Sequence, residues 1–432
     1  MQLSCSSLGR YLSTGYRARR RERRLLVLVA VIAVAGVSLS SRFSGGAWHR
    51  GLQLGGSLGI GLFCLHFFFC LAGFSGDEYL LPLCGFLCAL SLTILAGLSP
   101  VTALRQLYWM LLGLALIPVA ALPRQWHSLA EYRYLMGITG LSLLFFTALF
   151  GVEQWGARLW LEIGPVRFQP GEVVRLGLGV FIAGILSENS QLFAHPTAKL
   201  GPFSIPEPRH IMPLLSMWIL FLFVLVVQRD LGSAILYYAL FALLSYAATG
   251  QIVYLVLPAL MGGLGGVLAA SVFPHVATRF EIWLNPWASP RGAGYQIVQT
   301  MFALANGGWL GRGLGQGLAR AIPASHTDLP LVVIGEELGF LGLLPCLTAQ
   351  FLLAARGLKV SFRCGHGFLR LLGLAVVTGW SLSVFLAAGG LMRLVPLTGL
   401  VTPFVSYGGT AMVTNLFSLG LLLNISRREI WP

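Results

Sequence analysis

The chain contains little charge, and negative charge in particular. Only 10% of its 432 residues are charged whereas 56% are hydrophobic, and soluble domains carry roughly 25% charged residues. A soluble fold cannot bury that much apolar surface, so a soluble globular domain is excluded. The formal net charge is +14. Because most basic residues lie in short stretches between apolar runs, nucleic-acid binding is not expected.

Metal, disulfide and nucleotide motifs are also missing. None of the 7 cysteines has metal-ligand spacing, and several lie in or beside apolar runs, where buried thiols are expected. The glycine-rich run from Gly311 to Gly317 does not follow a strand and is not followed by Gly-Lys-Ser/Thr, so it does not indicate a nucleotide site. It is either a tight turn against the membrane surface or flexible backbone beside a lipid-linked diphosphate.

Long apolar runs fill the rest of the sequence. A spanning helix needs about 20 mostly apolar residues, with about 17 as the lower limit, and about twelve runs pass that test. They lie near residues 25–41, 52–73, 79–98, 103–122, 135–152, 172–187, 212–228, 231–248, 252–274, 329–356, 369–391 and 403–425. The sequence therefore predicts an all-α, polytopic transmembrane helix bundle. No clean cleavage site follows the first run, which we interpret as a retained helix.

The positions of arginine and lysine predict the orientation of the bundle. The basic block from Arg17 to Arg24 directly precedes the first apolar run, which assigns the amino terminus to the cytoplasm. An even number of spans places both termini there. Three regions follow: a basic cytoplasmic tail at 1–24, amino-terminal transmembrane helices at 25–122, and a transmembrane core at 123–428. The core includes a long extracytoplasmic loop near 275–328, which we expect to be functional.

The predicted outer loop ends in a carboxylate. Asp328 directly precedes an apolar helix, where it could cap the helix or take part in chemistry. The same loop carries Arg279, Arg312 and His326, a set of cations suited to phosphate groups. Glu172 lies near several arginines and could pair with one of them or act in a site.

Four stretches carry a family resemblance. They are Gly156 to Trp160 (GARLW) with Phe168 to Glu172 (FQPGE); Asp230 to Ala234 (DLGSA); Asn285 to Gln296 with Gly311 to Gly317, His326 to Asp328 and Glu336 to Gly339; and Pro396 to Gly399 with Pro403 to Gly409. With these motifs in this order, the chain resembles the SEDS family (shape, elongation, division and sporulation) of RodA/FtsW/SpoVE-type glycosyltransferases over about residues 130–428.

The resemblance implies an enzyme. It would be a peptidoglycan glycosyltransferase that polymerises lipid II, an undecaprenyl-diphosphate-linked disaccharide peptide, at the outer face of the bacterial plasma membrane during elongation, division or sporulation. Asp328 matches the catalytic aspartate of the family and would remove the proton from the 4-hydroxyl of the acceptor sugar. A positioned base typically contributes roughly 10²- to 10⁴-fold to the rate.

Further residues match the family at positions that suggest substrate contacts. Glu172 and Asp230 occupy motif positions that could also serve helix packing, and Ser406 and Tyr407 lie in the last motif.

Arg279 and Arg312 are candidates to stabilise the leaving diphosphate, which a divalent cation (Mg²⁺ or Mn²⁺) could also do. No metal-ligand set and no soluble cofactor site is visible.

The resemblance also implies binding partners, and it shows where this chain has more than the family usually has. Family members act with a class B penicillin-binding transpeptidase, and membrane lipid surrounds them. The family usually has ten spans, so two amino-terminal helices are expected to be additional. Arg393 stands where the family usually has glycine and adds a cation on the outer side.

Two other functions compete with the polymerase. A flippase for lipid-linked precursors would use broken helices with polar groups at mid-membrane, and the glycines at 262–266 suit such a break. A non-catalytic scaffold for a transpeptidase would leave Asp328 as a helix cap. The position of Asp328 relative to the amino terminus of its helix distinguishes the scaffold from the enzyme.

Overall fold

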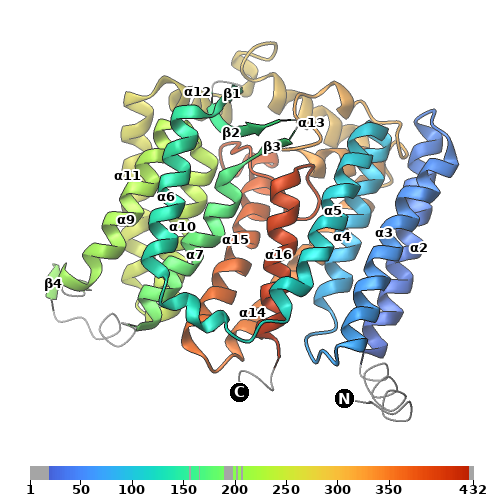
Figure 1. Cartoon of the computed structure of the whole chain (residues 1–432). Helices are drawn as coiled ribbons and strands as arrows, with labels where there is room; N and C mark the ends of the chain where they lie inside the picture. The colour runs from blue at the N-terminus through green and yellow to red at the C-terminus, as the bar shows by residue number, and fades with distance from the viewer. Residues whose placement is uncertain are drawn as a thin grey trace, which may run out of the picture. The chain divides into compact units, whose positions relative to one another are not determined.

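The computed structural model describes residues 19–154, 157–164, 166–188, 198–200, 203–205 and 208–427 (Figure 1). Most of the predicted basic tail, residues 1–18, lies outside the described residues, as does Gly156 of the first motif. The chain divides into two compact units, each built from separate stretches of sequence. Unit 1 comprises residues 1–123, 299–364 and 401–432, and unit 2 comprises residues 124–298 and 365–400.

Unit 1 contains the first four helices and the last helix of the part of the chain that the structure describes. Its elements are α2 (Arg20–Phe43), α3 (Trp48–Leu71), α4 (Leu80–Leu98), α5 (Pro100–Ala121), most of α13 (Tyr295–Gly307), η3 (Ala319–Ala321), α14 (Pro330–Phe362) and α16 (Gly409–Ile425). Helix α2 packs against α3 and α4, and α5 packs along α16. Helix α4 is the central element, since 89% of the residues in its most apolar 18-residue stretch are buried.

Unit 2 contains the middle helices and two small sheets. Its elements are η1 (Trp126–Ala130), α6 (Arg133–Phe150), β1 (Val152–Gln154), β2 (Ala157–Ile163), β3 (Val166–Phe168), α7 (Pro170–Glu188), β4 (Ala198–Leu200), β5 (Phe203–Ile205), α9 (Pro208–Val227), α10 (Leu231–Thr249), α11 (Val253–Val272), α12 (Pro274–Leu284), η2 (Pro286–Ala288) and α15 (Gly367–Leu391). Strands β1, β2 and β3 form an antiparallel sheet in that order, and β4 pairs with β5. The two sheets lie at opposite ends of the unit 2 helices (Figure 1).

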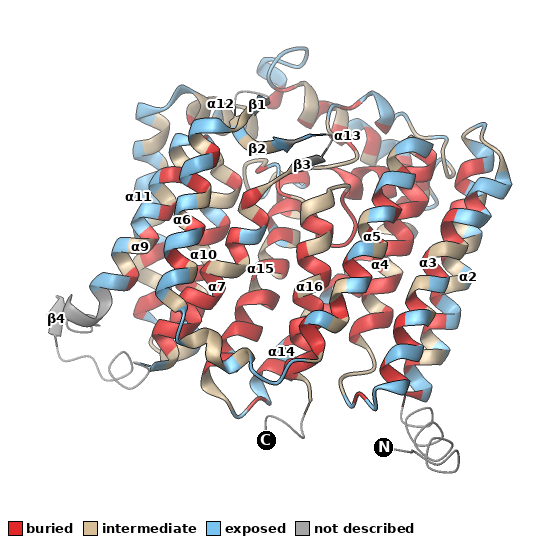
Figure 2. Cartoon of the chain, in the orientation of Figure 1, coloured by how far each residue is buried: buried red, intermediate tan, exposed pale blue. Residues whose placement is uncertain are grey.

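The burial pattern is that of a membrane protein. Large apolar side chains such as Ile60, Phe150 and Val267 are exposed, whereas polar side chains such as Gln106 and Glu336 are buried. Figure 2 shows α11 mostly in the colours of exposed and intermediate residues, and only 6% of its most apolar 18-residue stretch is buried. In water these surfaces would be unstable, but lipid solvates them. The predicted all-α, polytopic membrane fold is confirmed.

The number of spans depends on how length is judged. Ten described helices are long and apolar enough to cross a membrane. Two shorter apolar helices, Met212–Val227 and Gly409–Ile425, occupy the remaining two predicted positions. These two apolar stretches contain fewer than 18 residues each.

The predicted outer loop contains regular structure. It begins as α12, which starts with Pro274 at a position where its missing N–H costs nothing. It continues through η2, α13 and η3. The loop of residues 275–328 is therefore largely helical, and its glycine-rich part is confined to residues between α13 and η3.

Candidate functional site

Asp328 closes a tight turn directly before α14. Its backbone N–H donates to the carbonyl of Ala324 at 2.9 Å, and Ala324 has a left-handed φ of +55°. The residue at the amino-terminal cap of α14 is Leu329, which makes no side-chain capping bond. Asp328 is partly exposed. The cap position of α14 is therefore occupied by Leu329, the residue after Asp328.

A second turn holds the Asp328 turn in place. The backbone N–H of Tyr407 donates to the carbonyl of His326 at 2.9 Å, and the two rings lie 5.6 Å apart between centroids. This backbone contact joins two of the predicted site residues, His326 and Tyr407, and His326 lies two residues before Asp328 within unit 1.

The turn that carries Tyr407 is itself fixed from within. The Ser406 hydroxyl accepts from the Thr402 N–H at 2.7 Å, and both residues are buried. Gln106 of α5, which is fully buried, donates to the Ser406 carbonyl and accepts from the Gly408 N–H, each at 3.2 Å. Ser406 therefore positions the turn, and Gln106 anchors it to α5.

His326 differs from its predicted role as a cation. Burial lowers the pKa of the His326 imidazole below its usual value of 6.5. The ring is therefore neutral near pH 7 and can serve as a hydrogen-bonding group. The lowered pKa disfavours a cationic His326, and contact of this residue with substrate stays a prediction.

Glu336 and Glu337 hold the glycine-rich loop against α14. Glu336 accepts from the Ala319 N–H at 2.7 Å, and Glu337 accepts from the Gly315 N–H at 2.9 Å. Both carboxylates are buried. Immediately after them, α14 is interrupted at Gly339, where φ is +67°. The interruption frees backbone groups that pair with the loop, such as the Phe340 N–H with the Gly308 carbonyl at 2.9 Å.

The glycines of this loop are required by close backbone approach. A Cβ atom at Gly311 would lie 2.2 Å from the Glu337 carbonyl oxygen, and φ at Gly311 is +77°. The loop is a tight turn packed on α14, which agrees with the first of the two sequence-based alternatives. Arg312 is anchored through its N–H to the Glu336 carbonyl at 2.9 Å, while its side chain is exposed.

The predicted site residues of unit 2 have structural partners. Glu172 and Arg175 are both buried and form an ion pair at 3.1 Å, with Arg175 also donating to Ser383 at 3.5 Å. The pair lies one turn apart on α7. A buried carboxylate needs such a partner, so this contact is sufficient reason for Glu172 to be acidic.

Asp230 is the amino-terminal cap of α10. Its side chain accepts from the Ser233 N–H at 2.9 Å. Burial raises the pKa of the Asp230 carboxyl, although the Ser233 bonds and the charge of Arg279 act in the opposite direction. Arg279 donates to the carbonyls of Leu397 and Thr398 at 3.0 and 3.4 Å. These contacts fix the segment after α15.

Arg393 and the end of α12 form hydrogen bonds in both directions. Its guanidinium donates to the carbonyls of Trp283 and Leu284 at 3.0 and 2.8 Å, and the Trp283 indole donates to the Arg393 carbonyl at 2.8 Å. The additional cation that the sequence indicated is thus bound by carbonyl oxygens.

Gln106 is the functional neighbour that sequence reasoning missed. It is an amide within an apolar helix, and buried polar side chains in a membrane usually have a partner. That signal was available, but the identity of its partner, a turn 300 residues later in the chain, was not. Among the described residues, no group of three or more His, Cys, Asp or Glu side chains could hold a metal ion.

Comparison with known proteins shows to which family the chain belongs. A family model described as "Cell cycle protein" (FtsW/RodA/SpoVE) matches residues 79–430. The chain belongs to this family. The RodA/FtsW/SpoVE match begins at the start of α4, so α2 and α3 precede it.

Curated relatives in the family share about a third of their residues with this chain. The peptidoglycan glycosyltransferase RodA of Mycobacterium tuberculosis is 34% identical over 364 residues, covering 81% of this chain and 78% of its own. The probable peptidoglycan glycosyltransferase FtsW of Geobacter metallireducens is 33% identical over 336 residues, covering 75% and 84%. The predicted family and enzyme class are confirmed.

Solved structures of family members share the fold. A chain from a structure described as "Structural coordination of polymerization and crosslinking by a peptidoglycan synthase complex" is 27% identical with a TM-score of 0.68, covering 82% of this chain and 98% of its own. RodA of Thermus thermophilus is 25% identical with a TM-score of 0.57, covering 83% and 98%.

Proposed function

We propose that this RodA/FtsW-type enzyme polymerises lipid II into glycan strands at the outer face of the bacterial plasma membrane, with Asp328 as the general base. The observation that carries the proposal is the presentation of Asp328. Its backbone is fixed by Ala324, its neighbour His326 is held by Tyr407, and the residue is partly exposed directly before α14. A base must be held in place and accessible in this way.

The reaction is a displacement at the anomeric carbon of the donor sugar. The Asp328 carboxylate takes the proton from the 4-hydroxyl of the acceptor as that oxygen forms its bond to the donor. The bond between the donor sugar and undecaprenyl diphosphate breaks, and the diphosphate departs with the electron pair. A sugar hydroxyl is a poor nucleophile, so proton removal during attack lowers the barrier.

Arg312 is the stronger candidate to stabilise the leaving diphosphate. Its backbone is anchored to α14 and its guanidinium is exposed within the unit that carries Asp328. The guanidinium of Arg279 already donates to two carbonyl groups. A divalent cation, Mg²⁺ or Mn²⁺, would supply the same charge if the substrate diphosphate brought it.

The orientation of the enzyme in the membrane and its partner are inferred from its charge distribution and from its similarity to known proteins. The positive-inside rule supports cytoplasmic termini. The solved relative comes from a complex described as coordinating polymerization and crosslinking, which supports a class B penicillin-binding transpeptidase as the partner of this chain. Substrate contacts by Glu172, Asp230, Ser406 and Tyr407 stay predictions.

The flippase alternative has weaker support. Helix α11 is continuous from Val253 to Val272, so the glycines at 262–266 do not break it. Helix α14 is broken at Gly339, but the two carboxylates before the break already accept loop amides. A transport site would need polar groups available to cargo at such a break.

Lipid II polymerisation by the purified protein, alone and with its transpeptidase, tests the proposal. We expect Asp328→Ala and Asp328→Asn to reduce the rate by roughly 10²- to 10⁴-fold. Glu162→Gln is the matched control, because Glu162 is an exposed carboxylate paired with Arg167 at 2.8 Å, and it should retain the wild-type rate.

Two results would contradict the proposal in different ways. Folded Asp328 variants that polymerise at the wild-type rate would remove Asp328 from the mechanism. A wild-type protein that stays inactive with its true partner would remove the polymerase, and the flippase or scaffold function would then be favoured.

A further inference from the structure

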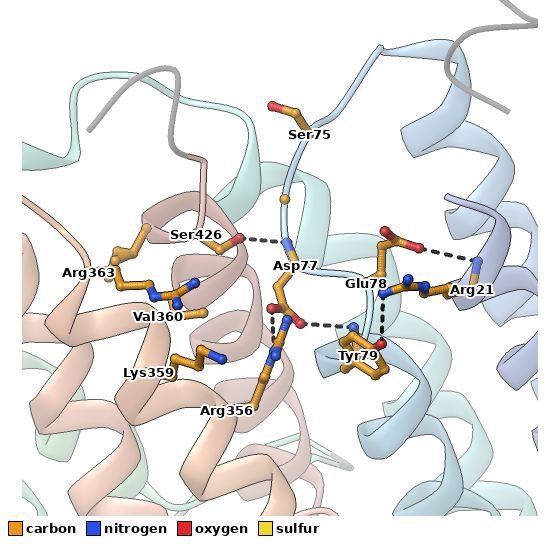
Figure 3. Close-up of a pocket in the computed structure, with 12 residues that line it drawn as sticks. Arg21, Ser75, Asp77, Glu78, Tyr79, Arg356, Lys359, Val360, Arg363 and Ser426 are labelled. Atoms are coloured by element: carbon orange, nitrogen blue, oxygen red, sulfur yellow. Dashed lines mark hydrogen bonds and ion pairs between the residues drawn. The ribbon is translucent and has the colours of Figure 1, made fainter. Parts of the chain in front are cut away.

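A cavity of about 410 Å³ lies within unit 1, away from the Asp328 turn. Four segments form it: the first turn of α2, the connection between α3 and α4, the last two turns of α14 and the end of α16 (Figure 3). Its size is within the range of roughly 300–1,000 Å³ that is typical of small-molecule sites. The beginning of α2 and the end of α16 lie at the same end of unit 1 (Figure 1).

One wall of the cavity is rigid and electrically neutral. Asp77 accepts from the Arg356 guanidinium at 2.6 Å and from the Tyr79 N–H at 2.9 Å, and its own N–H donates to the Ser426 hydroxyl at 2.9 Å. Arg356 also lies over the Tyr79 ring, 4.6 Å from its centroid. Figure 3 shows Asp77 between Arg356 and Ser426, with dashed lines to both and to Tyr79. The wall is therefore formed before any ligand binds.

The opposite wall orients a further cation. Glu78 accepts from the backbone N–H of Arg21 at 3.2 Å, and the Arg21 guanidinium donates to the Tyr79 hydroxyl at 3.4 Å. The phenol carries no charge, so the positive charge of Arg21 is not neutralised by that contact.

Lys359 and Arg363 supply the positive charge that has no partner. Lys359 lies in the last turn of α14 and Arg363 directly follows that helix. Both line the cavity, and both are exposed. Within the part of the chain that the structure describes, neither forms an ion pair or a side-chain hydrogen bond. Four basic side chains thus face two carboxylates, one of which is already bound to Arg356. The cavity has an excess of two positive charges.

We propose that this cavity binds the phosphate group of an anionic membrane lipid, with Lys359, Arg363 and Arg21 as its ligands. A guanidinium and an ammonium beside each other suit a phosphate diester. Basic residues next to a span attract anionic headgroups of the cytoplasmic leaflet, and the positive-inside rule assigns this end of unit 1 to that leaflet. The site is separate from glycosyl transfer and does not depend on it.

Lipid binding by the full-length protein in detergent tests the proposal. Native mass spectrometry would give the apparent affinity for phosphatidylglycerol and for phosphatidylcholine, which carries no net charge. We expect Lys359→Ala combined with Arg363→Ala to weaken phosphatidylglycerol binding by roughly 30-fold, on the basis of about 1 kcal/mol per basic residue. Binding of phosphatidylcholine should not change.

A matched control removes the same charge elsewhere. Arg124 and Arg370 are exposed basic residues near helix ends and do not line the cavity. Arg124→Ala combined with Arg370→Ala should leave phosphatidylglycerol affinity at the wild-type value. A second test keeps every cation: Ser75, which lines the cavity and is exposed, is changed by Ser75→Glu. The new carboxylate should occupy the cations and weaken binding to a similar extent.

Two outcomes would overturn the proposal. Equal weakening by both double variants, or unchanged binding in Ser75→Glu, would indicate diffuse attraction to the membrane surface and no site. If inorganic phosphate binds with the same dependence on Lys359 and Arg363 while phosphatidylglycerol binding does not depend on them, the ligand is a soluble phosphate and the lipid source is wrong.

Discussion

Single residues carry both the chemistry and the positioning of this enzyme. Asp328 is partly exposed, whereas the residues that hold its turn in place, such as Gln106 and Ser406, are buried. Sequence motifs predicted Asp328 as the catalytic base, because an acid at the boundary of an apolar helix stands out. They could not predict that Arg393 and Arg279 donate to backbone carbonyls. Every residue has a backbone carbonyl, so the sequence does not indicate which one an arginine contacts.

Stability should depend on pH through His326. Its folded pKa is below the usual 6.5, so at acidic pH the unfolded chain binds more protons than the folded chain. The free energy of unfolding should therefore fall as the pH drops through 6.5, and the loss should be complete below the folded pKa. Thermal unfolding of wild type and His326→Gln, from about pH 7.5 to 5.5, measures this effect.

Comparison of His326→Gln with wild type isolates the contribution of the His326 ring to the pH dependence of stability. Gln keeps a polar side chain but does not titrate, so part of the pH dependence should disappear. His275 and His366 also have pKa values lowered by burial and should account for the remainder. An unchanged pH profile in His326→Gln would show that the His326 ring is not enclosed.

At the scale of elements, apolar length predicted the helices well, and loop contacts could not be predicted. Each run of apolar residues corresponds to a helix because backbone polar groups in lipid must be paired internally. The interruption of α14 at Gly339 is different. It is accompanied by hydrogen bonds to Glu337 and Glu336 from the amides of Gly315 and Ala319, which lie 22 and 17 residues earlier. No periodicity in the sequence predicts such a contact.

The glycine-rich loop makes a sharp test of this packing. Gly311→Ala should destabilise the protein by at least about 1–2 kcal/mol, the cost of a left-handed conformation for a residue with a side chain. The new Cβ would also meet the Glu337 carbonyl at 2.2 Å. The melting temperature in detergent measures the effect, and lipid II polymerisation should fall with it because Arg312 is anchored by the same loop.

Gly265→Ala is the matched control for this prediction. A Cβ atom at Gly265 on α11 meets nothing within 4 Å, so the same substitution there should not lower the melting temperature. Equal destabilisation by the two variants would mean that the loop does not pack on α14 as described.

At the scale of the whole molecule, the first two helices are integral to unit 1 although the family match begins after them. Helix α2 packs on α4 so closely that a Cβ atom at Gly36 would lie 2.7 Å from the Thr93 hydroxyl. A buried network of Arg19, Glu22 and His66 joins α2 to α3. The sequence indicated two added spans, but not that they cover a face of α4.

Removal of residues 1–78 should therefore destabilise the enzyme. The face of α4 that α2 covers would be left to lipid, and the small residues that permit close packing would lose their partners. We expect a lower melting temperature and a lower yield of folded protein than for the full chain. A truncated protein that is as stable and as active as the full chain would show that α2 and α3 are accessory.

The contact between Asp77 and Ser426 also determines when this molecule can be completed during its synthesis. The two residues are 349 positions apart, and Asn424 likewise donates to the Ala121 and Pro123 carbonyls across about 300 positions. Helix α5 must wait in the membrane for α16, which is made about 300 residues later. The amino-terminal helices therefore remain unfinished until α16 has been inserted, and insertion factors and quality-control proteases have access to them during that interval.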